Sequence, residues 1–454
     1  VRCKNAGMTS QVTLPLWAFI LILLFAAVTF ASHFLFPSVR WFFRRRMEKA
    51  VKRLNERLDR PIEPFKLLRR QDMIQRLVYD PEVTQAIVDH APSEGVREDV
   101  AFERARRYAR EIVPSFSASV YFGFAITAAR FLSTSLYRVR MVHQDAGLAN
   151  VDPKATVVFV MNHRSNMDYV LVTYLAADRS ALSYAVGEWA RVWPLSRLIR
   201  AMGAYFIRRK SRNELYRKVL AKYVQQATSA GVTQAVFPEG GLSLDGSLAR
   251  PKVGILKYIL EGAAGARRDV VFVPIALNYD RVLEVTILLQ AQAKGERKFR
   301  ARISVVFMAV LRQIRLRITG KFHRFGYAAV SFGEPLTLSH LTEGDIRPEA
   351  LSATIMARIA AAVPVLPVPL TAYLLLKNGP MTRDALEIVY TDAMKQLESA
   401  QVHVPRNNRD YAVEFGLRNL MERQLVVEEA GRIRVAEGQE PLVGFYANSI
   451  KHLM

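Results

Sequence analysis

The sequence predicts an α/β fold in which a mostly parallel sheet is flanked by helices. Short runs of β-branched and apolar residues occupy Thr156–Met161, Gln234–Phe237 and Val270–Leu277. Stretches with helical patterns lie between or beside them, over Asn213–Ser229 and Lys252–Gly262. Strands that alternate with helices are typical of units whose strands run parallel, which is the reason for this fold class.

Composition and charge set bounds on function. The chain has 454 residues, of which 51% are hydrophobic and 23% charged, as expected for an ordered protein of about two to four domains. Lys plus Arg number 64 against 41 Asp plus Glu, a formal net charge of +23. Such an excess favours a nucleic acid, an anionic membrane face, or an acidic substrate or carrier. The single cysteine, Cys3, excludes a disulfide scaffold, a cysteine nucleophile and a cysteine-based zinc site.

The first predicted element is a transmembrane helix over residues 12–36, preceded by an N-terminal tail over 1–11. Val12–Phe36 contains no Lys, Arg, Asp or Glu, and about 20 apolar residues suffice to cross a bilayer core. Arginines follow it at 40 and 44–46, so the positive-inside rule predicts a single pass through the inner membrane with the remaining chain in the cytoplasm. A cleaved signal peptide is the alternative. The length of the segment, the lack of a clear A-x-A site and the basic cluster disfavour it.

Three further regions follow the predicted anchor. Residues 37–145 form a helical N-terminal region, in which the uncharged segment Val113–Ala129 is too short for a span and predicts a buried or interfacial helix. Residues 146–346 form the α/β domain, whose last strand is Tyr327–Phe332. Residues 347–454 form a mainly helical C-terminal domain that ends with helices and a small hairpin.

A candidate acid–base pair follows the strand Thr156–Met161, at a strand end where open sheets place their ligands. The sequence there reads NHRSNMDY and puts His163 five residues before Asp168. An imidazole can take a proton from a hydroxyl, while a carboxylate fixes its tautomer and stabilises the imidazolium. In isolation this spacing is more often structural, with the histidine capping a helix and the aspartate making a surface contact. The sequence blocks that follow favour a functional interpretation of this pair.

Three more blocks occur in order along the α/β region: GAYFIRR at 203–209, FPEGG at 237–241 and VPIALNYDR at 273–281. With the histidine block, they resemble the glycerolipid acyltransferases that carry an H-x4-D motif. The most similar branch is that of the glycerol-3-phosphate and dihydroxyacetone-phosphate acyltransferases. The tail LVGFYANSIKHLM resembles the C-terminal extension of that branch, so the likeness covers roughly residues 101–454.

The resemblance implies a glycerolipid-acyltransferase-like fold and a membrane-bound enzyme. This enzyme would move a fatty acyl group from an acyl thioester to the hydroxyl of glycerol-3-phosphate, the first step of phospholipid synthesis. His163 would be the general base, and Asp168 would orient it. The donor would be acyl-CoA or an acyl carrier protein. The resemblance implies no cofactor or metal, and the eight histidines show no zinc motif.

The resemblance also implies roles for residues that bind substrate. Arg208 would hold the acceptor phosphate, with Arg209 beside it, because a guanidinium suits phosphate geometry. The other implied residues would shape the turn, hold acceptor and backbone, or line the acyl side; they are Arg164, Ser165, Glu239, Gly240, Gly241 and Pro274.

The third block departs from the family pattern. The phosphate-acceptor branch usually has basic residues after its glycines, but here Leu242, Leu244 and Ser247 stand at these places. Arg250 and Lys252 lie just beyond. A lost charged hydrogen bond could cost about 1.5–3 kcal/mol of binding. The sequence therefore leaves dihydroxyacetone phosphate, a lysophospholipid, another polyol phosphate or an uncharged alcohol open as the acceptor.

Other function classes have weaker support. Residues 294–324 contain ten Lys or Arg and one acid, which suits either a solvated face or contact with anionic headgroups, coenzyme A phosphates or a carrier protein. No nucleic-acid signature is present, so no nucleic-acid partner is expected. An inert membrane adaptor on the same fold would show no acyl transfer. A thioesterase or lipase would release fatty acid without an acceptor, but no G-x-S-x-G elbow exists for it.

Overall fold

The computed structural model describes residues 15–142, 151–175, 180–187, 191, 193, 195–208, 213–295, 325–342, 344, 346–397 and 409–454. The chain divides into two compact units, whose boundary in the sequence lies between Arg57 and Leu58. The inner boundaries expected at 145/146 and 346/347 stay predictions.

The first unit contains one long helix, α1 (Leu16–Asn55). Lys52 and Arg53 lie in its last turn, where cations interact favourably with the helix dipole. Large apolar side chains of its first half are exposed: Leu16, Trp17, Phe19, Ile20, Leu21, Ile22, Leu23, Leu24, Phe25, Val28 and Phe30.

Within the described ranges, none of the helices combines the length and the apolarity that crossing a membrane requires. The transmembrane helix expected over 12–36 is therefore not found there. Residues 12–14 lie outside the described residues, as do the side chains of 31–41. The rest of the predicted span belongs to α1, which continues through the basic residues to Asn55.

The second unit is built on a sheet to which eight strands of the described chain contribute. The order is β1-β7-β6-β2-β5-β3-β4, with β8 pairing beside β6. The β1–β7 pair is parallel, and so are the pairs that join β6, β2, β5, β3 and β4, whereas β7 and β8 run antiparallel to β6. The strand bounds are β1 (Arg138–Val142), β2 (Thr156–Met161), β3 (Ser183–Val186), β4 (Tyr205–Phe206), β5 (Gln234–Val236), β6 (Val270–Tyr279), β7 (Tyr327–Phe332) and β8 (Leu336–Thr337).

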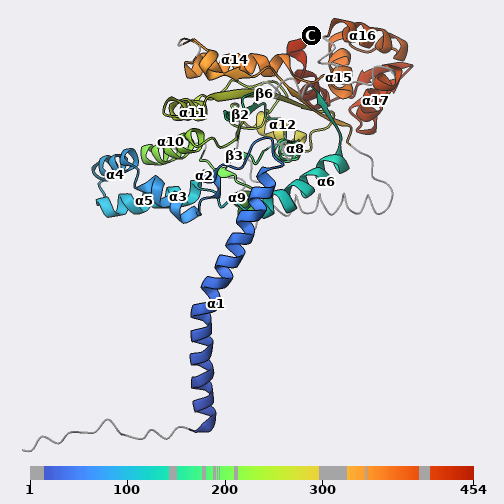
Figure 1. Ribbon diagram of the computed structural model, residues 1–454. Helices are drawn as coiled ribbons and strands as arrows, with labels where there is room; N and C mark the ends of the chain where they lie inside the picture. Colours follow the sequence, from blue (N-terminus) through green and yellow to red (C-terminus); the bar gives the residue numbers. More distant parts are fainter. Residues whose placement is uncertain are drawn as a thin grey trace, which may run out of the picture. The chain divides into compact units, whose positions relative to one another are not determined.

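Helices cover this sheet (Figure 1). Every residue of β2, β6 and β7 is buried, as expected for central strands covered on both faces. Helix α14 packs against β6, and α6 packs against α8. The helices of this unit are α2 (Pro64–Leu67), α3 (Arg70–Val78), α4 (Pro81–Ser93), α5 (Glu98–Ile112), the π-helix η1 (Ser119–Ala125), α6 (Ile126–Leu136), α8 (Met167–Leu175), α9 (Leu195–Ala201), α10 (Glu214–Ser229), α11 (Gly254–Ala264), α12 (Val285–Ala293), the 3-10 turn η3 (Leu338–His340), α14 (Pro348–Ala361), α15 (Pro367–Asn378), α16 (Arg383–Gln396), α17 (Arg409–Glu422), α18 (Glu440–Asn448) and the 3-10 turn η4 (Lys451–Leu453).

The predicted α/β class with a mostly parallel sheet is confirmed. Helix α10 begins after Asn213, whose side chain accepts a hydrogen bond from the backbone N–H of Tyr216 at 2.9 Å, a capping bond that favours a start at this point. The C-terminal hairpin is present as β9 (Val426–Glu429) and β10 (Arg432–Val435). Its turn places Ala430 and Gly431 at positive φ, as a two-residue hairpin turn requires.

One region differs from its prediction. Residues 37–145 were expected to be helical, but Arg138–Val142 form strand β1, which pairs with β7. The segment reads RVRMV and alternates charged and apolar residues, the period of a strand with one exposed face. Its short length and its position after α6 hid it among the helical patterns. The uncharged segment 113–129 likewise becomes helical only near Ser119, and it continues from η1 into α6.

Candidate active site

Parallel strands bring the motif blocks to one edge of the sheet. The histidine block follows β2, and the FPEGG block follows β5, which pairs with β2. The fourth block forms β6, the other neighbour of β2. Asn162 extends this pairing beyond β2: its side chain donates to Leu277 O at 2.9 Å and accepts from Leu277 N at 2.7 Å. These two bonds fix the backbone at the point where the chain leaves the sheet, directly before His163.

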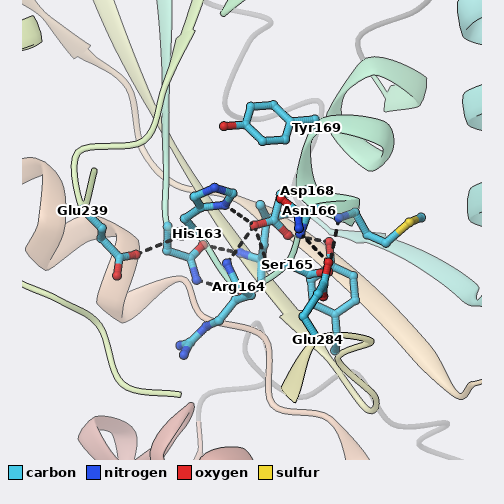
Figure 2. A network of polar contacts seen from close by, with 12 residues as sticks. His163, Arg164, Ser165, Asn166, Asp168, Tyr169, Glu239 and Glu284 are labelled. Carbon is cyan, nitrogen blue, oxygen red and sulfur yellow. Dashed lines mark hydrogen bonds and ion pairs between the residues drawn. The ribbon is translucent and has the colours of Figure 1, made fainter. Parts of the chain in front are cut away.

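His163 and Asp168 face each other across the turn between β2 and α8 (Figure 2). Nδ1 of His163 lies 2.8 Å from Oδ2 of Asp168, and both side chains are buried, with exposed fractions of 2% and 0%. A carboxylate can only accept, so Nδ1 carries the proton in this hydrogen bond. The predicted pair is thus brought together in the geometry of a base and its orienting carboxylate.

Asp168 is held by four donors. Its Oδ2 accepts from His163 and from the backbone N–H groups of Arg164 at 2.7 Å and Ser165 at 3.0 Å. Its Oδ1 accepts from the hydroxyl of Tyr279 at 2.6 Å. These four hydrogen bonds fix the carboxylate of Asp168 beside the imidazole.

The imidazole of His163 lies between aromatic rings. Its centroid is 4.2 Å from that of Phe237 and 5.3 Å from that of Tyr169, and the Tyr169 contact is edge-on. Among the described residues, Nε2 of His163 has no hydrogen-bond partner. With the proton on Nδ1, this nitrogen carries a free lone pair and can accept a proton from a bound hydroxyl.

Glu239 joins the first and third motif blocks through the backbone. Its Oε1 accepts from His163 N and its Oε2 from Ala249 N, both at 2.9 Å. Burial raises the pKa of Glu239, while the Arg164 guanidinium and these two N–H groups oppose that shift. Gly240, which follows it, has φ +67°, a conformation that glycine adopts without strain. Glu239 and Gly240 therefore fix the shape of the turn next to the base.

Glu284 is a site residue that the sequence analysis missed. Its carboxylate accepts from the hydroxyl of Ser165 at 2.8 Å and from the N–H of Asn166 at 3.1 Å. The hydroxyl of Ser165 also accepts from Met167 N at 3.2 Å, at the start of α8. Figure 2 shows Glu284 on the side of the turn opposite Glu239. The side chain of Ser165 is therefore engaged in hydrogen bonds within the turn.

The C-terminal residues contribute to the same site, which the sequence analysis also did not foresee. Arg164 is 1% exposed, and its guanidinium donates to Ser449 O at 3.3 Å. Burial lowers the pKa of Arg164, and the carboxylates of Glu239, Asp168 and Asp245 oppose that shift.

The end of α18 also contacts β6 and the loop that follows the third motif block. Asn448 donates to Asp245 O at 3.0 Å, and Asn278 of β6 donates to the hydroxyl of Ser449 at 3.2 Å. The end of α18 thus contacts the first and fourth motif blocks and the loop after the third.

The residues that stand where the family usually has basic residues make contacts within the fold. Leu242 and Leu244 are partly buried and pack against the hydrophobic core. Ser247 donates from its hydroxyl to Asp245 Oδ1 at 2.6 Å. Gly246 has φ +87°, and a Cβ at this position would collide with the backbone carbonyl of Phe445 in α18. The loop that contains Gly246 therefore packs against α18 through close backbone contact.

We expect Gly246→Ala to lower the free energy of unfolding by about 2–4 kcal/mol, from the strained backbone and the collision with Phe445. Chemical denaturation would measure the change. Gly438→Ala is the matched control, because Gly438 also has positive φ (+73°) but nothing lies within 4 Å of its Cβ position. Equal losses in the two variants would show that contact with α18 does not stabilise the loop.

Arg208 has an acidic partner within the fold. Its Nε and Nη2 donate to the two oxygens of Glu111 at 2.8 and 2.7 Å, and its guanidinium lies against the rings of Tyr108 and Tyr216. Arg191 also pairs with Glu111. The side chain of Arg208 is 33% exposed, so solvent reaches it, but none of these contacts joins Arg208 to His163.

Other expected site residues are placed less centrally. Pro274 lies within β6 opposite Val160, three residues before His163, and its carbonyl accepts from Gly333 N at 2.8 Å. Gly241 follows Gly240 in the Glu239 turn. Arg209 lies outside the described residues, as does the basic stretch from 296 to 324. No group of three or more His, Cys, Asp or Glu within the described chain is arranged to hold a metal ion.

Family models match two parts of the chain. The acyltransferase model matches residues 143–278, which contain the His163 turn and the second and third motif blocks. The model of the glycerol-3-phosphate acyltransferase C-terminal region matches residues 315–454. The C-terminal match includes Ser449 and the helix that contacts the candidate site.

Curated relatives extend over most of the chain. The glycerol-3-phosphate acyltransferase of Aeromonas hydrophila subsp. hydrophila is 30% identical over 420 residues, or 86% of this chain and 50% of the relative. That of Actinobacillus succinogenes is 28% identical over 431 residues, again 86% of this chain and 50% of the relative. The chain thus spans about half the length of these relatives.

A solved structure, the 1-acyl-sn-glycerophosphate (LPA) acyltransferase PlsC from Thermotoga maritima, is similar to part of this chain. The alignment of the two covers 61% of this chain and 91% of the PlsC chain. It has 16% identity and a TM-score of 0.33. The family models and relatives confirm the resemblance of the motif blocks: one part of the chain is similar to the acyltransferase family and another to the C-terminal region of the glycerol-3-phosphate acyltransferases.

Proposed function

We propose that the chain transfers a fatty acyl group from an acyl thioester to the hydroxyl of glycerol-3-phosphate. The observation that carries the proposal is the buried His163–Asp168 hydrogen bond, which leaves Nε2 of His163 able to accept a proton. The relatives named glycerol-3-phosphate acyltransferases support the choice of acceptor. First-step phospholipid synthesis is the role that this reaction would serve.

In the proposed reaction, Nε2 of His163 takes the proton of the acceptor hydroxyl as the hydroxyl oxygen attacks the thioester carbonyl. The carbon–sulfur bond then breaks, and the imidazolium returns the proton to the departing thiolate. Asp168 stabilises the transient imidazolium and keeps the ring in place. Glu239, Ser165 and Glu284 hold the turn that carries both residues.

In this proposal, Arg208 binds the phosphate of the acceptor. In the sheet, β4 is separated from β2 by β5 and β3, so at about 4.8 Å per pair the two strand ends lie about 14 Å apart. An arginine side chain and a glycerol phosphate together can bridge a distance of this order. Leu242 and Leu244 provide no charge, which suggests weaker phosphate binding than a site with arginines there. Dihydroxyacetone phosphate and lysophospholipids remain the alternative acceptors.

An acceptor panel assayed with one long-chain thioester tests the function. Purified protein should acylate glycerol-3-phosphate faster than dihydroxyacetone phosphate, a lysophospholipid or glycerol, and parallel assays with acyl-CoA and acyl carrier protein should identify the donor. Fatty acid released without an acceptor would favour a thioesterase. No transfer to any acceptor would favour an inert adaptor on this fold.

Arg208→Ala should raise the KM for glycerol-3-phosphate about tenfold to a hundredfold, through loss of a charged contact of about 1.5–3 kcal/mol. Glu111→Gln is the informative companion, because it weakens the only described acidic partner of Arg208 and should leave this KM equal or lower. Steady-state kinetics at saturating thioester measure both. If KM rises equally in the two variants, the Glu111 pair serves the fold and Arg208 does not bind phosphate.

We propose that the protein works at the cytoplasmic face of the inner membrane, with the bilayer as a partner. The exposed apolar side chains from Leu16 to Phe30 in α1 support attachment, as does the net charge of +23 for contact with anionic lipid. Removing residues 1–36 should weaken sedimentation with membranes, more so in high salt. Full-length protein that stays in the supernatant would contradict this part of the proposal.

A further inference from the structure

Tyr279 connects the fourth motif block to the acid–base pair. It is the last residue of β6, and its backbone lies one strand away from the end of β2. Its hydroxyl donates to Asp168 Oδ1 at 2.6 Å, whereas His163 and two backbone N–H groups use Oδ2. Tyr279 is thus the only described side chain that holds the second oxygen of this carboxylate.

The side chain of Tyr279 is itself fixed. It is 1% exposed, and its ring lies 5.4 Å from that of Tyr137 at an interplanar angle of 59°. Burial raises the pKa of Tyr279 well above its ordinary value, and the Asp168 carboxylate raises it further. The phenol of Tyr279 is therefore a neutral donor near neutral pH.

We propose that Tyr279 is a positioning residue for the acid–base pair: through Oδ1 it fixes the rotamer of Asp168 and thereby the ring of His163. A carboxylate held at one oxygen alone can rotate about its terminal bond, which is a broad torsion. The bond from Tyr279 removes this freedom, so the oxygen facing Nδ1 stays in place while His163 gains and loses a proton. The expected fall in kcat rests on the proposed acyl transfer. The expected effect on the positions of Asp168 and His163 does not.

The test is Tyr279→Phe, which removes one hydroxyl and keeps the ring. We expect kcat for acyl transfer to fall about tenfold to a hundredfold, as for loss of one hydrogen bond to a charged group, with KM for both substrates unchanged. Tyr137→Phe is the matched control. It removes a neighbouring buried hydroxyl that donates to the backbone of Arg281 at 2.7 Å, and its kcat should stay close to that of the unmodified protein.

A double-mutant cycle with Asp168→Asn asks whether Tyr279 acts through Asp168. Once the carboxylate is replaced, Tyr279→Phe should cost little more activity. Losses that multiply in the double variant would overturn the proposal, as would a Tyr279→Phe variant with unchanged kcat.

A spectroscopic measurement separates this inference from the proposed function. Nitrogen-15 NMR of the labelled imidazole ring of His163 should show the proton on Nδ1 in both proteins, with a broadened Nδ1 signal in Tyr279→Phe because the carboxylate and the ring are held less firmly. If no acyl transfer is found with any acceptor, the proposed function fails, and the ring spectra still decide the role of Tyr279. Identical spectra in the two proteins would refute it.

Discussion

Replacing His163 with alanine is expected to lower kcat for acyl transfer by about 10²–10⁴-fold, the usual contribution of a general base. The structure gives a reason to expect little change in the stability of the fold. The fixed parts of the turn are made by Glu239, Asn162 and the backbone N–H groups of Arg164 and Ser165, none of which needs the imidazole. The effect should therefore lie in kcat, with substrate binding largely retained.

Acyl-transfer kinetics and thermal unfolding, measured on the same preparations, check this expectation. His340→Ala is a suitable control, because His340 is exposed and lies in the short turn η3. A His163→Ala variant that unfolds at the usual temperature and turns over at a near-normal rate would show that another group accepts the proton.

The sequence predicted the central strands well because burial makes them distinctive. The runs TVVFVM and YAAVSF coincide with β2 and β7, and each is buried at every position. The strand β3 was missed, since it has four residues and carries too few positions for a periodic pattern. Its existence depends on the neighbours with which it pairs.

The candidate site divides in the same way into local and distant parts. His163 and Asp168 could be paired from the sequence because one turn connects them. The partners that complete the turn are far away in the chain: Tyr279 lies 111 residues from Asp168, Glu284 lies 119 from Ser165, and Ser449 lies 285 from Arg164. Only the order of strands in the sheet and the docking of α18 bring them near.

Arg208 shows how a missing partner changes an interpretation. From the sequence it is a free guanidinium at the end of GAYFIRR, available for a phosphate. In the structure it forms a bidentate pair with Glu111, 97 residues earlier in the chain. No local pattern marks that glutamate, which lies in the last turn of α5 among several other charged residues. A phosphate would compete with an existing ion pair for this arginine.

Asp168→Asn is expected to lower kcat by about 10²–10⁴-fold with little change in stability. The reason lies in the donors around the carboxylate. The position of Oδ2 faces the N–H groups of Arg164 and Ser165, so the amide oxygen of asparagine must occupy it and the amide nitrogen must take the position of Oδ1. There it can donate to the hydroxyl of Tyr279, because a phenol also accepts hydrogen bonds.

The asparagine variant thus keeps both the turn and the proton on Nδ1, and loses only the negative charge. Its defect should appear in kcat, because the charge matters when His163 becomes an imidazolium. Asp168→Ala differs: it leaves several buried donors unpaired, so it should lower both activity and the unfolding temperature. Kinetics and calorimetry on the two variants distinguish these effects. An asparagine variant with full activity would mean that the carboxylate serves the fold alone and that His163 needs no counter-charge.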